Sequence, residues 1–127
     1  MSGHENILVE KSFCFAIRIV RLYQYLSQQK QEKIMSRQLL KSGTSIGANI
    51  REAIRGQSRN DFVSKLNIAL KEASETEYWI ELLYRTDYIT EKEYNSISGE
   101  CKELNKILIS IVRTTKSNKQ DTLNCEL

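Results

Sequence analysis

Apolar residues recur every three or four positions along most of the chain, and this spacing places them on one side of an α-helix. The stretches that show it are approximately residues 6–27, 33–55, 60–86 and 90–115. Thr90 with Glu93, and Ser58 with the weaker partner Asp61, have the spacing of a capping box at a helix start. The pattern therefore predicts an all-α protein that folds as an up-down-up-down antiparallel four-helix bundle with short turns.

The bundle is expected to occupy residues 1–115 as one domain. A chain of 127 residues is long enough for a sizeable core. It contains no proline and only five glycines, which favours long helices with few breaks. Residues 116–127 are polar and lack helical periodicity, so we predict a short disordered C-terminal tail.

Two of the glycines, Gly43 and Gly47, lie one turn apart in the second predicted helix. Each costs about 0.5–1 kcal/mol relative to alanine in a helix interior. A fold tolerates such a pair where another backbone must come close, so the pair predicts tight packing against a neighbouring helix. A phosphate-binding loop would need its glycines between a strand and a helix, and no strand is predicted before them.

The first predicted helix is apolar on two sides. Its two rows are Val9, Phe13, Ala16, Ile17, Val20 and Tyr23, and Leu8, Phe15, Ile19, Leu22 and Leu26. A helix at the surface of a bundle needs only one apolar side, so we expect this helix to be central in the bundle or to contact another subunit. On the third helix, Trp79 lies in a second patch that either contacts another subunit or covers the edge of its own bundle. The predicted subunit interface comprises Phe15, Ile19, Leu22, Trp79 and Leu82.

A row of cations follows the second predicted helix on the side away from its apolar face. It consists of Lys33, Arg37, Lys41, Arg51 and Arg55. At helical spacing these residues lie within an arc of about 80° and span about 33 Å. This α-helical row is the best candidate for a binding site, with the phosphates of RNA or DNA as its ligand. The competing interpretation is an ordinary solvated face that Glu52 partly neutralises.

The remaining composition argues against catalysis and metal binding. The chain has three cysteines and a single histidine, His4, so a disulfide framework, a zinc site or a di-iron site cannot be built in the usual way. Ser42, Ser45 and Cys101 have no histidine base nearby in the sequence, so we expect no enzyme and no cofactor. The net charge of +3 permits a polyanionic partner without requiring one. With no signal-peptide pattern and no long apolar run, we expect a cytoplasmic protein without membrane contact.

An acidic run on the third predicted helix consists of Glu72, Glu75, Glu77 and Glu81. Most of it is expected to be a solvated face. Glu77 is the exception, because helical spacing places it beside apolar residues. A carboxylate in that position needs a partner, and we expect an arginine from the first or second helix.

Two motifs carry a family resemblance. Residues 36–40 and 42–53 form the first, and Asp61-Phe62, Lys65-Leu66, residues 69–73, Glu75-Thr76 and Tyr78-Trp79 form the second. Together they resemble the bacterial four helix bundle protein family, also called 23S rRNA intervening-sequence proteins, and the resemblance covers about residues 6–115.

The resemblance implies a four-helix protomer that assembles into a homopentamer, as in the related accessory variability proteins of diversity-generating retroelements. Those accessory proteins bind nucleic acid and a reverse transcriptase through a basic surface. The resemblance therefore suggests three partners for this chain: further copies of itself, RNA or DNA, and a reverse transcriptase. The alternative is a protein-interaction scaffold or accessory subunit that does not bind nucleic acid directly.

Overall fold

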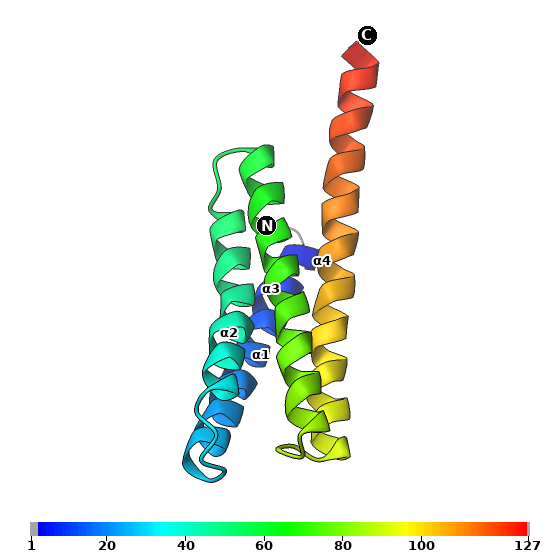
Figure 1. The fold of residues 1–127 in the computed structure, drawn as a ribbon. Helices are drawn as coiled ribbons and strands as arrows, with labels where there is room; N and C mark the ends of the chain where they lie inside the picture. Colours follow the sequence, from blue (N-terminus) through cyan, green and yellow to red (C-terminus); the bar gives the residue numbers. More distant parts are fainter. Residues whose placement is uncertain (1–2, 127) are drawn as a thin grey trace.

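The computed structural model describes residues 3–126, with the side chains of residue 3 and residues 6–116. The described chain forms four helices: α1 (Gly3–Gln28), α2 (Met35–Ile54), α3 (Arg59–Arg85) and α4 (Glu91–Glu126). Successive helices run in opposite directions (Figure 1). Each of α1 and α3 packs closely against both α2 and α4, whereas the diagonal pairs, α1 with α3 and α2 with α4, have no closely approaching Cα atoms in the described chain. The predicted four-helix bundle is therefore confirmed, and the described residues contain no strand.

Two helix starts lie where the capping spacing predicted them. At the start of α4, the Thr90 backbone N–H donates to Glu93 Oε1 (2.8 Å) and the Glu93 N–H donates to Thr90 Oγ1 (3.2 Å). At the start of α3, the Asp61 N–H donates to Ser58 Oγ (3.0 Å). These side chains satisfy backbone N–H groups that the first turn of a helix leaves unpaired. Each helix can therefore begin directly after a short connection.

The start of α2 and the end of α4 differ from the prediction. The second helix was expected to begin near Lys33, but α2 begins at Met35. Glu32 explains the later start, because its carboxylate accepts the backbone N–H of Ile34 (3.3 Å) and of Ser36 (2.8 Å). The α4 backbone continues past the predicted end near Thr115 to Glu126. The side chains of residues 117–126 and all of residue 127 lie outside the described part of the chain, so the predicted disordered tail stays a prediction.

The core lies along the bundle axis and takes one apolar row from each helix. Its largest fully buried side chains include Phe15, Ile19, Ile46, Leu66 and Leu108. A polar pair crosses the core between α2 and α3, where the Thr76 hydroxyl donates to Ser42 Oγ (3.0 Å). The described side chains leave no buried polar atom without a hydrogen-bond partner, so the buried hydroxyls do not carry an unpaired desolvation cost.

The two glycines of α2 lie close to a neighbouring helix, as the sequence predicted, and that helix is α1. A Cβ atom added to Gly43 would lie 2.8 Å from both Cγ atoms of Ile19, and one added to Gly47 would lie 3.3 Å from Ser12 Oγ. Real Cβ atoms do not approach other heavy atoms as closely as the first of these distances. Glycine at position 43 therefore lets α2 approach α1 at the level of a fully buried isoleucine.

Replacing Gly43 by alanine is expected to lower the free energy of unfolding by about 1–3 kcal/mol, because Ile19 is buried and cannot move aside without disturbing the core. The matched control is Gly99→Ala in α4, where an added Cβ meets nothing within 4 Å. That variant should gain about 0.5–1 kcal/mol from helix propensity. Urea unfolding followed by circular dichroism measures both changes. Equal stabilisation of the two variants would show that α1 and α2 are not in close contact.

The predicted subunit interface is wrong for two of its five residues. Phe15 and Ile19 are 0% exposed within a single copy of the chain, so neither can contact a second copy. Leu22, Trp79 and Leu82 are half-buried, and their place in an interface stays a prediction. The other row of α1 faces outwards instead, with Phe13 50%, Ile17 40% and Val20 37% exposed. α1 is thus apolar on two sides, as predicted, but the row that supplied Phe15 and Ile19 to the predicted interface is the one that faces the core.

No helix in the described part of the chain combines the length and apolar character that crossing a bilayer requires.

Candidate nucleic-acid interface

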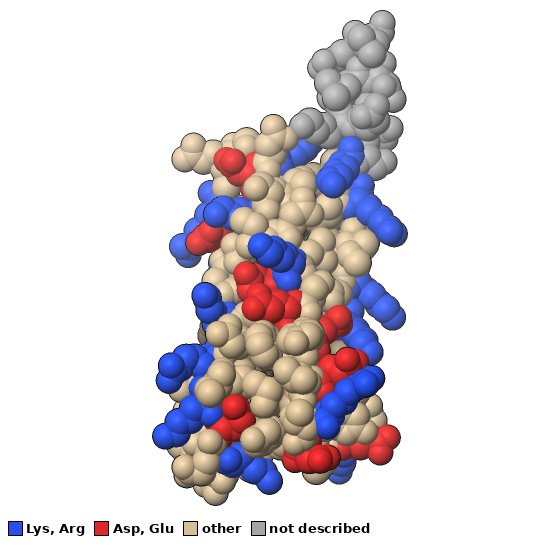
Figure 2. Space-filling view, in the orientation of Figure 1, with Lys and Arg blue, Asp and Glu red and all other residues tan. Residues whose placement is uncertain are grey.

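The basic row extends along the outer side of α2 and beyond both of its ends. Arg37, Lys41 and Arg51 lie in α2 itself, Lys33 precedes the helix, and Arg55 is its C-terminal cap residue. All five side chains are exposed. Figure 2 shows Lys and Arg side chains spaced along the left edge of the molecule, over α2. The structure therefore brings the five predicted residues to one edge of the bundle.

None of these five cations forms an ion pair with a described side chain. The carboxylate that was expected to neutralise part of the row, Glu52, is held instead by Lys65 of α3, with Nζ 2.9 Å from Oε2. Two cations of α1 behave differently, because Lys11 pairs with Glu103 (2.6 Å) and Arg18 with Glu100 (2.7 Å), both on α4. The five cations of the α2 row are exposed and make no such pair with a described side chain.

The α2 row consists of two clusters. Lys33, Arg37 and Lys41 lie towards one end of the helix, and Arg51 and Arg55 lie at the other. Lys41 and Arg51 are about 15 Å apart along the axis at the helical rise. Two clusters at this separation suit the repeated phosphates of a nucleic-acid backbone better than a single small anion.

The exposed aromatic ring of Phe13 borders the cluster that contains Arg51. This contact was not predicted from the sequence. The Arg51 guanidinium carbon lies 4.7 Å from the centroid of the Phe13 ring on α1. The outward apolar row of α1 therefore meets the basic row of α2 at this point. Helical periodicity could not reveal the contact, because it does not show which of the two apolar rows of α1 faces α2.

Tyr25, Tyr88 and Tyr94 are not equally available for stacking on a base. Tyr25 is 39% exposed and has Lys30 Nζ 5.9 Å from its ring centroid. Tyr94 stacks on Tyr84 with a centroid distance of 4.5 Å, and Tyr88 is half-buried against the core. Of these rings, only Tyr25 is exposed enough to stack on a base.

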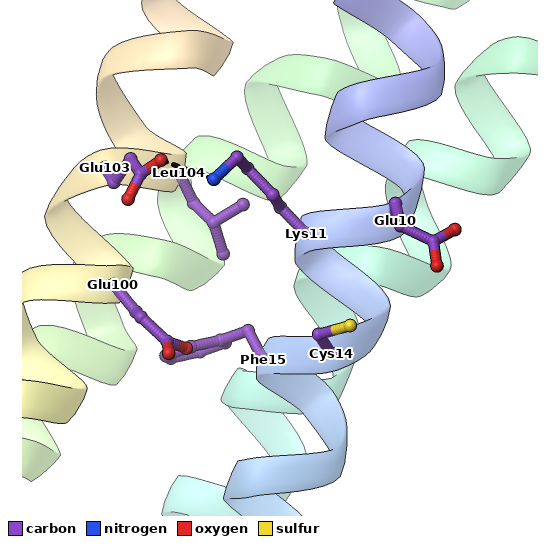
Figure 3. A pocket seen from close by; sticks show the side chains of 7 residues that line it. All are labelled: Glu10, Lys11, Cys14, Phe15, Glu100, Glu103 and Leu104. Atoms are coloured by element: carbon purple, nitrogen blue, oxygen red, sulfur yellow. Dashed lines mark hydrogen bonds and ion pairs between the residues drawn. The ribbon is translucent and has the colours of Figure 1, made fainter.

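The seam between α1 and α4 contains a cavity of about 240 Å³ beside the two interhelical ion pairs. Figure 3 shows Lys11 reaching across the seam to Glu103, while Glu10 points away from the other labelled side chains. The hydrogen bond from Lys11 to Glu103 and the charge of that carboxylate raise the pKa of Lys11 above its usual value. Among the described residues, no group of three His, Cys, Asp or Glu side chains is placed to hold a metal ion. The two ion pairs of the seam join α1 to α4.

Glu77 of α3 and Cys101 of α4 both form hydrogen bonds between these two helices. Glu77 does not pair with an arginine, as was expected, but accepts a hydrogen bond from Asn105 Nδ2 of α4 (3.4 Å). Burial, followed by the charge of Glu77, raises the pKa of the Cys101 thiol to about 12. A thiol held in the protonated form is a poor nucleophile, and Cys101 Sγ donates to the Ala73 carbonyl oxygen (3.5 Å). These groups connect α3 to α4.

A family model described as "23S rRNA-intervening sequence protein" matches residues 4–110. Among solved structures, the chain is similar to a crystal structure of a protein with unknown function from the S23 ribosomal protein family of Bacteroides thetaiotaomicron VPI-5482. The two chains are 59% identical, the alignment covers 87% of this chain and 98% of that chain, and the TM-score is 0.86. No curated protein matches the chain. The matched range includes the whole basic row of α2.

Proposed function

Since the chain belongs to the 23S rRNA-intervening sequence protein family, we propose that it is a non-enzymatic, homo-oligomeric helical bundle that binds RNA or DNA through the basic row of α2. The observation that carries the proposal is the set of five exposed cations on one edge, none of which is paired with a described carboxylate. The ligand class follows from the charge and length of this row. Phosphate contacts carry no sequence information, so binding is expected to be non-specific.

The distribution of charge supports this proposal more strongly than the net charge. A formal charge of +3 is small, but the three carboxylates Glu52, Glu100 and Glu103 are each paired with a cation of a neighbouring helix. The α2 edge is therefore locally basic. Local cation density, rather than total charge, determines how many counterions a nucleic acid releases on binding.

The outward row of α1 supports the oligomeric part of the proposal. Phe13, Ile17 and Val20 are 37–50% exposed and follow one side of the helix. Exposed apolar side chains that lie in a continuous row are typical of a contact with another molecule. A second copy of the chain is the proposed partner, and the family resemblance makes a homopentamer the expected assembly and a reverse transcriptase a candidate protein partner.

The variant Arg37→Glu, Arg55→Glu tests the nucleic-acid part directly. At low salt it should bind a structured RNA on the order of 100-fold more weakly than the unmodified chain, because two phosphate contacts become repulsive. A mobility-shift titration measures the change. The matched control is Lys71→Glu, Lys92→Glu, which alters net charge equally at two exposed positions outside the row. If both variants lost the same affinity, or neither lost any, the α2 row would not be the binding site.

A protein-interaction scaffold is the second candidate function. It is favoured by exposed apolar and aromatic side chains of α3: Tyr78 is 60% exposed and packs edge-on against Trp79, and Ile68 is 38% exposed. Pull-down from the host with and without nuclease separates the two functions. A partner that is retained after nuclease treatment, together with no RNA binding by the purified chain, would favour the scaffold.

A further inference from the structure

α4 carries a second row of cations, which the sequence analysis did not single out. The row is formed by Lys102, Lys106, Arg113 and Lys116, and all four side chains are exposed. At 100° per residue they lie within an arc of about 80°, and they span about 21 Å along the axis. No Asp or Glu occurs from Leu104 to Lys116, so this half of the helix is purely basic.

These cations, like those of α2, form no ion pair with a described side chain. The carboxylates nearest to them in the sequence, Glu100 and Glu103, point towards α1 and pair with Arg18 and Lys11. The contacts with α1 therefore separate the acidic side of α4 from its basic side. The row remains on the outer surface, where Ile109, 38% exposed, is its only large apolar neighbour on the same face.

The two basic rows lie on opposite edges of the protomer. α2 and α4 are diagonal helices with no closely approaching Cα atoms in the described chain, so their outer sides point away from each other. Figure 2 shows Lys and Arg side chains along the left edge and the upper part of the right edge, and side chains of both charges on the face between them and at the lower right. α3, which lies between α2 and α4, exposes side chains of both signs: Lys71 and Glu75, and Glu81, which pairs with Arg85 (3.9 Å). A polyanion crossing α3 would meet carboxylates as well as cations, so the two rows are not joined by a continuous basic surface.

We propose that the α4 basic row is a second binding face for the phosphate backbone of RNA or DNA, so that each protomer can hold two nucleic-acid segments at once. This inference rests on the proposed function, because it assumes that unpaired cations of this chain bind phosphates. Nucleic acid fits the face better than a membrane surface does. A helix that lies on a bilayer buries a broad apolar side, and the α4 row contains one exposed isoleucine.

The test uses a fluorescein-labelled 20-base-pair RNA duplex and five forms of the full-length chain at low salt. They are the unmodified chain, the α2 variant Arg37→Glu, Arg55→Glu, the α4 variant Lys106→Glu, Arg113→Glu, the combination of both, and the control Lys71→Glu, Lys92→Glu. Fluorescence anisotropy gives affinity, and sedimentation equilibrium with excess duplex gives the number of duplexes bound per protomer. Thermal unfolding confirms that each variant is folded.

We expect two duplexes per protomer for the unmodified chain and the control, and one for either single variant. The α2 variant should retain saturable binding that the combined variant loses.

If the α4 variant matches the control and the α2 variant alone abolishes binding, the second face is ruled out while the proposed function stands. If the α4 variant loses binding and the α2 variant does not, the α2 assignment fails, and the inference that each protomer holds two segments fails with it. If the unmodified chain binds no duplex, both proposals fail. Binding through the α4 row to phosphatidylglycerol vesicles but not to duplex would assign it to anionic membranes and overturn the inference.

Discussion

Replacing Phe15 by alanine is expected to lower the free energy of unfolding by about 3–5 kcal/mol. The side chain is 0% exposed and lies in the core of a single protomer. Its removal loses the free energy gained by burying the ring and also leaves a cavity. Domains of this size are commonly stable by about 5–15 kcal/mol, so the variant would lose a large part of its stability. Urea unfolding at a protein concentration low enough to favour the protomer measures the loss.

Phe13→Ala is the matched control, because it removes the same ring two positions away on the same helix. Phe13 is 50% exposed and has Arg51 over its face. Its loss should cost the protomer less than about 1 kcal/mol and should instead weaken self-association. Similar losses for the two variants would show that the two rows of α1 are not divided between core and surface as the structure has them.

Replacing Ile17 by aspartate is expected to convert the assembly to a protomer of 14.8 kDa at micromolar concentration. Ile17 is 40% exposed, at the centre of the outward row of α1. A carboxylate buried there against a second copy would have no partner, and an unpaired buried charge costs several kcal/mol. Size-exclusion chromatography with light scattering measures the mass.

The control for this variant is Ile109→Asp, the same substitution at 38% exposure on α4. It should leave the assembly unchanged, because α4 is not the proposed self-association surface. Dissociation by the control but not by Ile17→Asp would move the interface to α4. An unmodified chain that is already a monomer would contradict the oligomeric part of the proposal.

Local sequence patterns were sufficient to predict the four helices and their main contacts. Capping depends on residues three positions apart, so Thr90 and Glu93 predicted the start of α4 correctly. The pair of glycines in α2 predicted a close approach, and Gly43 indeed faces Ile19. Capping depends only on residues within one helical turn of each other. The glycine pair requires a close neighbouring helix but does not specify which one.

The assignment of the two α1 rows could not be made in the same way. Both rows are apolar, and periodicity gives their angle to each other but not to the neighbouring helices. The orientation depends on long-range contacts: Gly43 makes room for Ile19, and Lys11 and Arg18 pair with carboxylates of α4. These contacts turn Phe15 inwards and Phe13 outwards, whereas the predicted interface included Phe15.

The same distinction applies to the candidate site: the placement of its cations follows from local spacing, whereas their ion pairing does not. Helical spacing placed Arg37, Lys41 and Arg51 on one edge, as the structure does. Which carboxylates neutralise which cations depends on tertiary contacts, so the pairing of Glu52 with Lys65 could not be predicted. The α4 row had a visible sequence signal, namely the lack of Asp and Glu from Leu104 to Lys116, and charge patterning along α4 could have identified it.

The central claim is that this chain binds the charged backbone of nucleic acids. The most direct test is the dependence of the binding constant on salt, measured by fluorescence anisotropy with a short RNA duplex and excess protein. If all five α2 cations contact phosphates of duplex nucleic acid, the slope of log K against log salt should approach about −4.5, at about −0.9 for each contact. A slope shallower than about −1, or no binding at low salt, would contradict the claim.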